Sequence, residues 1–195
     1  MVYFYIIYHQ LDFHKNLKEL NCFNNYLISL PSLNENLKEL ECSNNDLLFL
    51  PQLNEKLEIL KCNDNRLNSL PSLVNTNLKE LECSNNMLTK LPCLNNNLTD
   101  LDCSINELTV LPYLNEILDH LLCFNNWLIS LPTINEKLKY LSCYDSPIDE
   151  ILDFTSGNID ILTKTKTKIK ILNKFRCLYY SLKFKNNFGI GYGSK

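Results

Sequence analysis

The sequence of 195 residues is unusual first for what it lacks. It has no alanine, only four glycines and only two arginines, whereas Asn, Lys and Ile are abundant, which indicates a genome rich in A and T. No apolar run approaches the roughly 18 residues of a membrane-spanning helix, so a transmembrane protein is excluded. The apolar start, MVYFYIIYHQ, lacks a basic n-region and a small-residue cleavage site, and we therefore expect no signal peptide.

Leucine and asparagine dominate what is present. The chain has 39 Leu and 28 Asn, and its hydrophobic content of 45% can fill a core, which excludes a low-complexity disordered chain. The net charge of −3 is unevenly distributed. Residues 1–154 have 10 basic and 21 acidic side chains, a net charge of −11, whereas residues 155–195 have 9 basic and 1 acidic, a net charge of +8. The sequence therefore predicts an acidic body and a basic tail.

Seven cysteines recur at steps of 20 or 21 residues and mark an internal repeat: Cys22, Cys42, Cys62, Cys83, Cys103, Cys123 and Cys143. The common pattern is L-x-x-L-x-C-x-x-N-x-L-x-x-L-P-x-L-N-x-x, as in LKELECSNNDLLFLPQLNEK from Leu37. Alternation before the cysteine predicts a short strand, and the proline excludes a helix interior in the second half. One repeat is too small to fold alone, but stacked repeats bury each other's leucine faces.

This pattern resembles the short, 20-residue leucine-rich repeat with LPxL in its second half, which is known from bacterial effector proteins and giant DNA viruses. The resemblance covers residues 17 to about 151. It implies an α/β fold, a right-handed solenoid or horseshoe with a parallel β-sheet on the concave face and little helix on the convex face. We expect an N-terminal cap over 1–16, about seven repeats over 17–154, and a basic C-terminal cap or tail, with a strand and a helix, over 155–195.

One asparagine per repeat is expected to have a structural role. In the family that the repeat resembles, this side chain turns inward and hydrogen-bonds the backbone where the strand bends away, which a carboxamide can do as both donor and acceptor. The column is Asn25, Asn45, Asn65, Asn86, Asn106 and Asn126. The seventh repeat has Ser146 and Pro147 instead, and the segment SPIDEILDF predicts a short helix with Ser146 as its N-cap.

The seven repeating cysteines are expected to be buried, reduced and small hydrophobic side chains. Side chains on in-register strands about 4.8 Å apart point the same way, which leaves their Cβ atoms beyond the mean disulfide separation of about 3.8 Å. A metal site would need a cluster such as C-x-x-C, which the sequence lacks, so we predict neither metal nor cofactor. Unpaired thiols predict an intracellular, reducing compartment of the producing or host cell. The exposure of Cys93 and Cys177 stays open.

The candidate binding surface is the concave face, where partners of such solenoids usually bind. Residues flanking the inward Leu and Cys are expected to face it in three columns, the third being Phe23, Ser43, Asn63, Ser84, Ser104, Phe124 and Tyr144. The middle of the array forms an acidic zone of Glu39, Glu41, Lys61, Glu80, Glu82, Asp100 and Asp102. The C-terminal part forms an aromatic zone of His120, Leu122, Phe124, Tyr140 and Tyr144, with Trp127 on the loop edge.

These zones favour a non-enzymatic, monomeric protein-interaction module whose unidentified protein partner has a basic stretch and an apolar anchor. The alternative is that the acids only provide solubility and that a C-terminal cap covers the aromatics. No nucleophile with its partners and no glycine-rich phosphate loop accompanies the carboxylates, so we predict no catalytic residues. By family analogy, a component of a ubiquitin ligase is a further hypothesis.

The basic tail allows two interpretations. Residues 159–171, IDILTKTKTKIKI, predict a strand with one lysine face, and the next 14 or so residues predict an amphipathic helix. The tail is expected to cap the last repeat. Alternatively, residues 164–185 bind an anionic membrane surface or nucleic acid.

Overall fold

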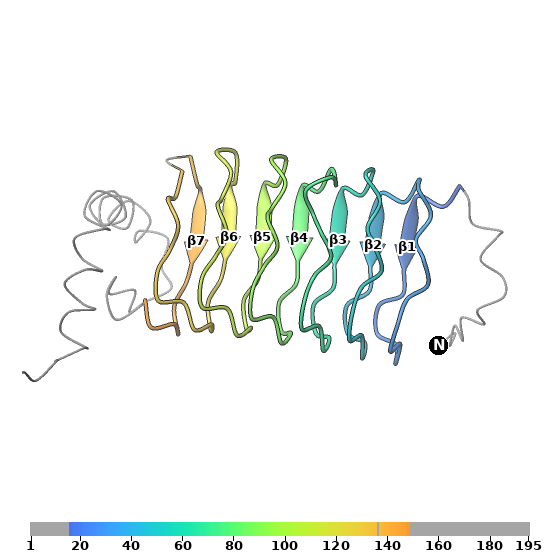
Figure 1. Ribbon diagram of the computed structural model, residues 1–195, viewed down its shortest axis with the longest axis horizontal. Coiled ribbons are helices and arrows are strands. Elements are labelled where there is room, and N and C mark those ends of the chain that lie inside the picture. Colours follow the sequence, from blue (N-terminus) through green and yellow to red (C-terminus); the bar gives the residue numbers. More distant parts are fainter. Residues whose placement is uncertain (1–15, 136, 149–195) are drawn as a thin grey trace, which may run out of the picture.

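The computed structural model describes residues 16–135 and 137–148. These residues form seven strands that stack side by side (Figure 1). The strands are β1 (Glu19–Asn21), β2 (Glu39–Glu41), β3 (Ile59–Lys61), β4 (Glu80–Glu82), β5 (Asp100–Asp102), β6 (His120–Leu122) and β7 (Tyr140–Ser142). The expected caps lie outside the described residues, apart from Asn16.

The strands form one parallel sheet in the order β1 to β7, so each repeat pairs with the next one along the chain. The register joins equivalent positions, for example Leu40 with Leu60 and Leu60 with Leu81. In residues 16–135 and 137–148 the return segments contain no helix. The predicted parallel solenoid with little helix is therefore confirmed. No helix in this part of the chain is long and apolar enough to cross a membrane.

The core is built from the repeated leucines. In the second repeat the five leucines of the pattern are all buried: Leu37, Leu40, Leu47, Leu50 and Leu53. The central leucine of each strand from β2 to β6 is buried as well, while the residues on either side are half-buried or exposed. The first and third strand residues therefore form the outer surface of the sheet, called the strand face below, which corresponds to the predicted concave face.

The repeating cysteines are all buried, as predicted. Their thiols also form hydrogen bonds that a leucine or valine lacks. Cys42 Sγ donates to the carbonyl oxygen of Lys61 on the next strand at 3.3 Å, and Cys62 Sγ donates to that of Glu82 at 3.3 Å. Burial raises the pKa of Cys22 to about 11. Burial also raises the thiol pKa well above the ordinary value at Cys62, where the adjacent ladder thiols add to the effect.

Thiol reactivity should separate Cys93 from this ladder. Cys93 is exposed, whereas all seven ladder cysteines are buried. Only a thiolate attacks a disulfide reagent, and burial disfavours both access and ionisation. With 5,5′-dithiobis(2-nitrobenzoate) at pH 8, we expect Cys93 to react in the fast phase and the ladder thiols at least 100-fold more slowly. Replacing Cys93→Ser should remove one fast thiol. Rapid reaction of more than two of the nine cysteines would contradict the buried ladder.

The predicted asparagine ladder is confirmed, and each member from Asn45 to Asn126 connects two adjacent repeats. Asn65 Nδ2 donates to the carbonyl oxygens of Cys42, Cys62 and Asn63 at 3.0 to 3.2 Å. Its Oδ1 accepts from the Leu47 amide of the preceding repeat at 3.0 Å. One carboxamide thus satisfies backbone groups that the bend leaves without partners.

The seventh repeat ends the asparagine ladder with a hydroxyl group. The side chain of Ser146 is buried, and its Oγ accepts a hydrogen bond from the Asn126 amide at 3.2 Å. The helix that we expected after Ser146 falls largely outside the described residues.

A second asparagine column stabilises the turns that precede the strands, and the repeat pattern alone had not assigned it a role. Asn115 Nδ2 donates to the carbonyl oxygens of Asn95 at 3.2 Å and Leu98 at 2.9 Å, and its Oδ1 accepts from the Ile117 amide at 2.9 Å. Asn135, one repeat further along, bonds in the same way to the carbonyl oxygens of Asn115 and Leu118 and to the Lys137 amide. The sequence signal for this second column was the asparagine that directly follows the last leucine of the repeat pattern.

The turn after each strand contains one residue with positive φ, between 51° and 56°. Asn and Asp tolerate this left-handed conformation better than other residues with a side chain. Six of the seven are of these types: Asn24, Asn44, Asp64, Asn85, Asn125 and Asp145. The seventh is Ile105, with φ of 52°. The side chains of neighbouring turns also bond, as Asn44 Nδ2 donates to Asn24 Oδ1 at 2.7 Å.

Candidate functional site

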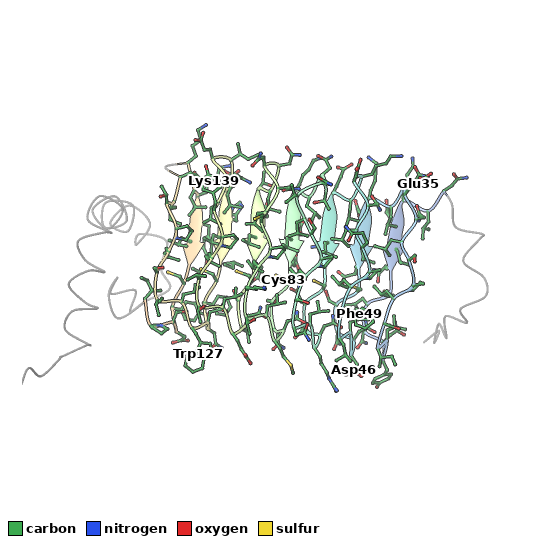
Figure 2. All side chains as sticks on the ribbon, in the orientation of Figure 1. Glu35, Asp46, Phe49, Cys83, Trp127 and Lys139 are labelled. Carbon is green, nitrogen blue, oxygen red and sulfur yellow. The ribbon has the colours of Figure 1, made fainter. Side chains whose placement is uncertain are left out.

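The register places the predicted zones as continuous rows on the strand face. Glu80 pairs with Asp100, which pairs with His120, and Glu82 pairs with Asp102, which pairs with Leu122. Neighbouring strands lie about 4.8 Å apart, so the side chains of each row are adjacent. The acidic zone therefore meets the aromatic zone between β5 and β6. Figure 2 shows the two edges that frame this face, one with Glu35 and Lys139, the other with Asp46 and Trp127.

Lys61 neutralises part of the acidic zone. Its Nζ lies 2.6 Å from Glu80 Oε1 and 2.6 Å from Glu82 Oε1, and all three side chains are about one-third exposed. Hydrogen bonds to these two carboxylates raise the pKa of Lys61 above its ordinary value. Asn63 Nδ2 adds a bond to Glu82 Oε2 at 2.7 Å.

The two carboxylates respond differently to this environment. Burial raises the pKa of Glu80 above its ordinary value. Burial acts in the same direction on Glu82, but hydrogen bonds from Lys61, Glu80 and Asn63 prevail and lower its pKa. Six carboxylates face one lysine in the acidic zone, so its formal net charge is −5, and the four carboxylates outside the Lys61 bridge have no basic partner inside the zone.

Some of these carboxylates also have a backbone role that the sequence analysis missed. Glu41 Oε1 accepts from the Ser43 amide at 2.9 Å, and Asp102 Oδ1 accepts from the Ser104 amide at 3.0 Å. Each closes the bend just after its strand, where the amide has left the sheet. An acceptor side chain two residues before the bend was the available signal, since Asn21 bonds the Phe23 amide in the same way.

The third predicted column was wrong for two of its members. Ser43 and Ser104 are buried, with 4% and 0% of their surfaces exposed. In this column Ser43 lies between Phe23 and Asn63, and Ser104 lies between Ser84 and Phe124. Buried side chains such as these cannot offer a surface to a partner. The Ser43 hydroxyl accepts from the Asn63 amide at 3.1 Å.

The aromatic zone is centred on a pair of stacked rings. The Phe124 and Tyr144 centroids lie 4.7 Å apart, with an interplanar angle of 7°. Tyr140 is 40% and Tyr144 is 38% exposed, so this apolar surface is open among the described residues. Trp127 is 63% exposed and projects at the edge where the strands end (Figure 2), as its predicted loop position implies.

His120 joins the two zones. Its Nδ1 lies 2.7 Å from Asp100 Oδ1, and Thr99 Oγ1 donates to Asp100 Oδ2 at 2.6 Å. No group of three or more His, Cys, Asp or Glu within residues 16–135 and 137–148 is arranged to hold a metal ion. The basic segment 164–185 lies outside the described residues, and its binding to membranes or nucleic acid stays a prediction.

The repeat period, the single parallel sheet and the asparagine ladder together define the class of this molecule: it is a leucine-rich repeat protein of the short, 20-residue type. Its sequence matches no family model. A search among curated proteins found no relative.

Solved structures of bacterial effectors are similar to this chain. YopM, a leucine-rich effector protein from Yersinia pestis, is 34% identical with a TM-score of 0.66, over 68% of this chain and 38% of that chain. YopM from Yersinia enterocolitica is also 34% identical, with a TM-score of 0.61, over 63% of this chain and 27% of that chain. This chain therefore spans well under half of either effector.

Proposed function

We propose that this protein is a non-enzymatic interaction module that binds a protein partner on its strand face. A leucine-rich repeat solenoid is a scaffold for protein interaction, because stacked repeats create an extended binding surface. One observation supports this face most strongly: the register aligns carboxylates of β4 and β5 in rows that lead directly to the aromatic zone on β6 and β7. The partner then has a basic stretch followed by an apolar anchor.

The acidic zone supplies attraction at a distance. Its negative net charge draws a basic segment to the face and raises the association rate, and this effect weakens with salt because mobile ions screen charges that are in contact with solvent. The Lys61 bridge divides the zone. The carboxylates of β2 lie on one side of it and those of β5 on the other, so the partner's basic residues need more than one position along the array.

The aromatic zone supplies the anchor. Aromatic side chains are enriched at binding hot spots because they bury a large area with little loss of rotational freedom. The stacked rings of Phe124 and Tyr144 already restrain each other. When a partner's apolar side chain covers these rings, little free energy is spent on ordering them.

Reversing the charge of the acidic zone should abolish partner capture. We expect the full chain with Glu80, Glu82, Asp100 and Asp102 replaced by Lys to lose at least 90% of a partner captured by the native chain from extract of the producing or host cell. The reason is that four attractive contacts become repulsive. Quantitative mass spectrometry of the captured proteins is the measurement.

A matched control keeps the same change in net charge away from the strand face. Glu35, Glu55, Glu107 and Glu116 are exposed and lie outside the strands, so their replacement by Lys should leave capture unchanged. Circular dichroism must show that both variants stay folded. Equal capture by the native and the strand-face variant would contradict the proposed site.

We further propose that the protein acts as a monomer in a reducing, intracellular compartment. The eight cysteines of the described part are free and seven of them are buried, which supports this setting because unpaired structural thiols are typical of reducing compartments.

A further inference from the structure

The turn after β5 contains an isoleucine in a conformation that suits it poorly. Ile105 has φ of 52°, whereas the six equivalent residues are Asn or Asp. A β-branched side chain in the left-handed region crowds its own backbone, so this turn stores strain. Ile105 also interrupts the side-chain bonds between turns, which elsewhere join Asn85 Nδ2 to Asp64 Oδ1 at 2.6 Å.

The preceding residue adds a second unfavourable feature. Ser104 is wholly buried, and its Oγ has no hydrogen-bond partner in the described structure. A buried hydroxyl without a partner is destabilising, because it has lost its bonds to water. Two adjacent residues thus lower the stability of one turn, while the equivalent turn of the second repeat satisfies its serine hydroxyl with the Asn63 amide.

The free energy gained by burying the Ile105 side chain is too small to offset the strain of its backbone. Its side chain is 39% exposed, so much of its apolar surface faces water. An asparagine there would both suit the backbone and extend the side-chain bonds of the neighbouring turns. The isoleucine therefore needs an explanation outside the folding of the solenoid.

The position of this turn supplies that explanation. The Ser104 amide donates to Asp102 Oδ1 at 3.0 Å, and the Ile105 amide donates to the Phe124 carbonyl oxygen at 2.9 Å. The turn thus connects the last carboxylates of the acidic zone to the first ring of the aromatic zone. Strained residues concentrate where proteins bind ligands, because selection there acts on contacts and not on stability.

We infer that Ile105 is a specificity-determining contact for a protein partner. The partner packs an apolar side chain against Ile105 and Phe124 and places a neighbouring Lys or Arg on the carboxylates of β5. Charge complementarity selects this occupant, since the acidic zone beside the turn has six carboxylates and a single lysine. The inference rests on the proposed function and identifies which partner sequence the strand face prefers.

Moving the isoleucine by one repeat tests this inference. The variants are Ile105→Asn, Asn85→Ile and the double variant N85I/I105N, all in the full chain. Asn85 has φ of 51°, so the double variant has the same composition and the same kind of strained turn, but in the wrong place. Ile105→Val retains both the branched apolar contact and the strain.

The probes are peptides selected on the native chain from a random 12-residue display library and then synthesised. We expect them to combine basic residues with a bulky apolar residue. Ile105→Asn and N85I/I105N should weaken their binding at least tenfold by isothermal titration calorimetry. Asn85→Ile and Ile105→Val should stay within threefold. Ile105→Asn should also raise the melting temperature by about 2 to 8 °C, because it relieves the strain.

The outcomes separate the inference from the proposed function. Binding within twofold of native by both Ile105→Asn and N85I/I105N would overturn the role of Ile105, even if the charge-reversed strand face no longer binds. If the charge-reversed variant binds the peptides as tightly as the native chain, the proposed site itself is wrong. A selection that enriches no peptide would contradict both.

Discussion

Raising the pH from 7 to 10 is expected to lower the free energy of unfolding by about 8 kcal/mol, which is comparable to the whole stability of a typical domain. The pKa values of Cys22, Cys42, Cys62, Cys83, Cys103 and Cys123 are all raised from an ordinary value of 9.0. In the folded chain these six thiols therefore stay protonated at pH 10, whereas in the unfolded chain they ionise.

The sign follows from proton binding. Above pH 9 the unfolded state binds fewer protons than the folded state, so stability is fully present below pH 9 and is lost as the pH rises toward the folded values. Each thiol contributes about 1.4 kcal/mol per pH unit in this range. For Cys22 the loss ends near its folded pKa of about 11. Urea unfolding under reducing conditions at pH 7, 8, 9 and 10, followed by circular dichroism, is the measurement.

A single replacement controls this experiment. Cys62→Val keeps an apolar side chain of similar size and removes one ionising group. The loss of stability between pH 7 and 10 should shrink by about one sixth in this variant, because one of the six ionising thiols is gone. A free energy of unfolding that stays constant up to pH 10 would show that the thiols ionise as easily in the folded chain, and would refute the buried ladder.

Replacing Asn65 by alanine should cost about 3 to 5 kcal/mol, a large loss for a point mutation, because it breaks a buried hydrogen-bond network. The side chain makes four hydrogen bonds, three donated and one accepted. Its removal leaves the Leu47 amide without a partner in a buried place. It also takes one of two donors from each of the carbonyl groups of Cys42, Cys62 and Asn63. The measurement is the midpoint of urea unfolding at pH 7.

Two further variants sharpen this result. Asn65→Asp has nearly the same shape but replaces the donors with acceptors that face carbonyl oxygens, so we expect at least as large a loss. Asn68→Ala changes an exposed asparagine of the same repeat and should stay within about 0.5 kcal/mol of the native chain. If Asn65→Ala and Asn68→Ala proved equally mild, the ladder would not stabilise the solenoid.

The repeat architecture could be predicted from the sequence because its physics is local and periodic. A 20-residue period with Leu at fixed positions determines which side chains face inward, and the proline excludes a helix in each second half. The register then follows, since equivalent positions must pair when identical units stack. The asparagine ladder was predicted for the same reason, because one residue recurs where every strand bends.

The candidate site was only partly predictable, because it depends on contacts between neighbouring repeats. The row formed by Glu80, Asp100 and His120 could be predicted from the repeat period. That Lys61 reaches two carboxylates of β4, or that the Phe124 ring stacks on Tyr144, depends on side-chain geometry across strands. The burial of Ser104 was missed because its alternation pattern alone assigned it to the surface.

The sequence by itself determined the period, the core positions and the residue types that line the strand face. These depend on spacing along the chain, which stacking converts directly into rows. The tertiary structure alone decided which charges neutralise each other, which carboxylates are committed to the backbone and where strain collects. The ion pairs arise between side chains about 20 residues apart, which only the stacked solenoid brings within hydrogen-bond distance. The bonds from carboxylates to the backbone join residues two apart, in the bend that follows a strand.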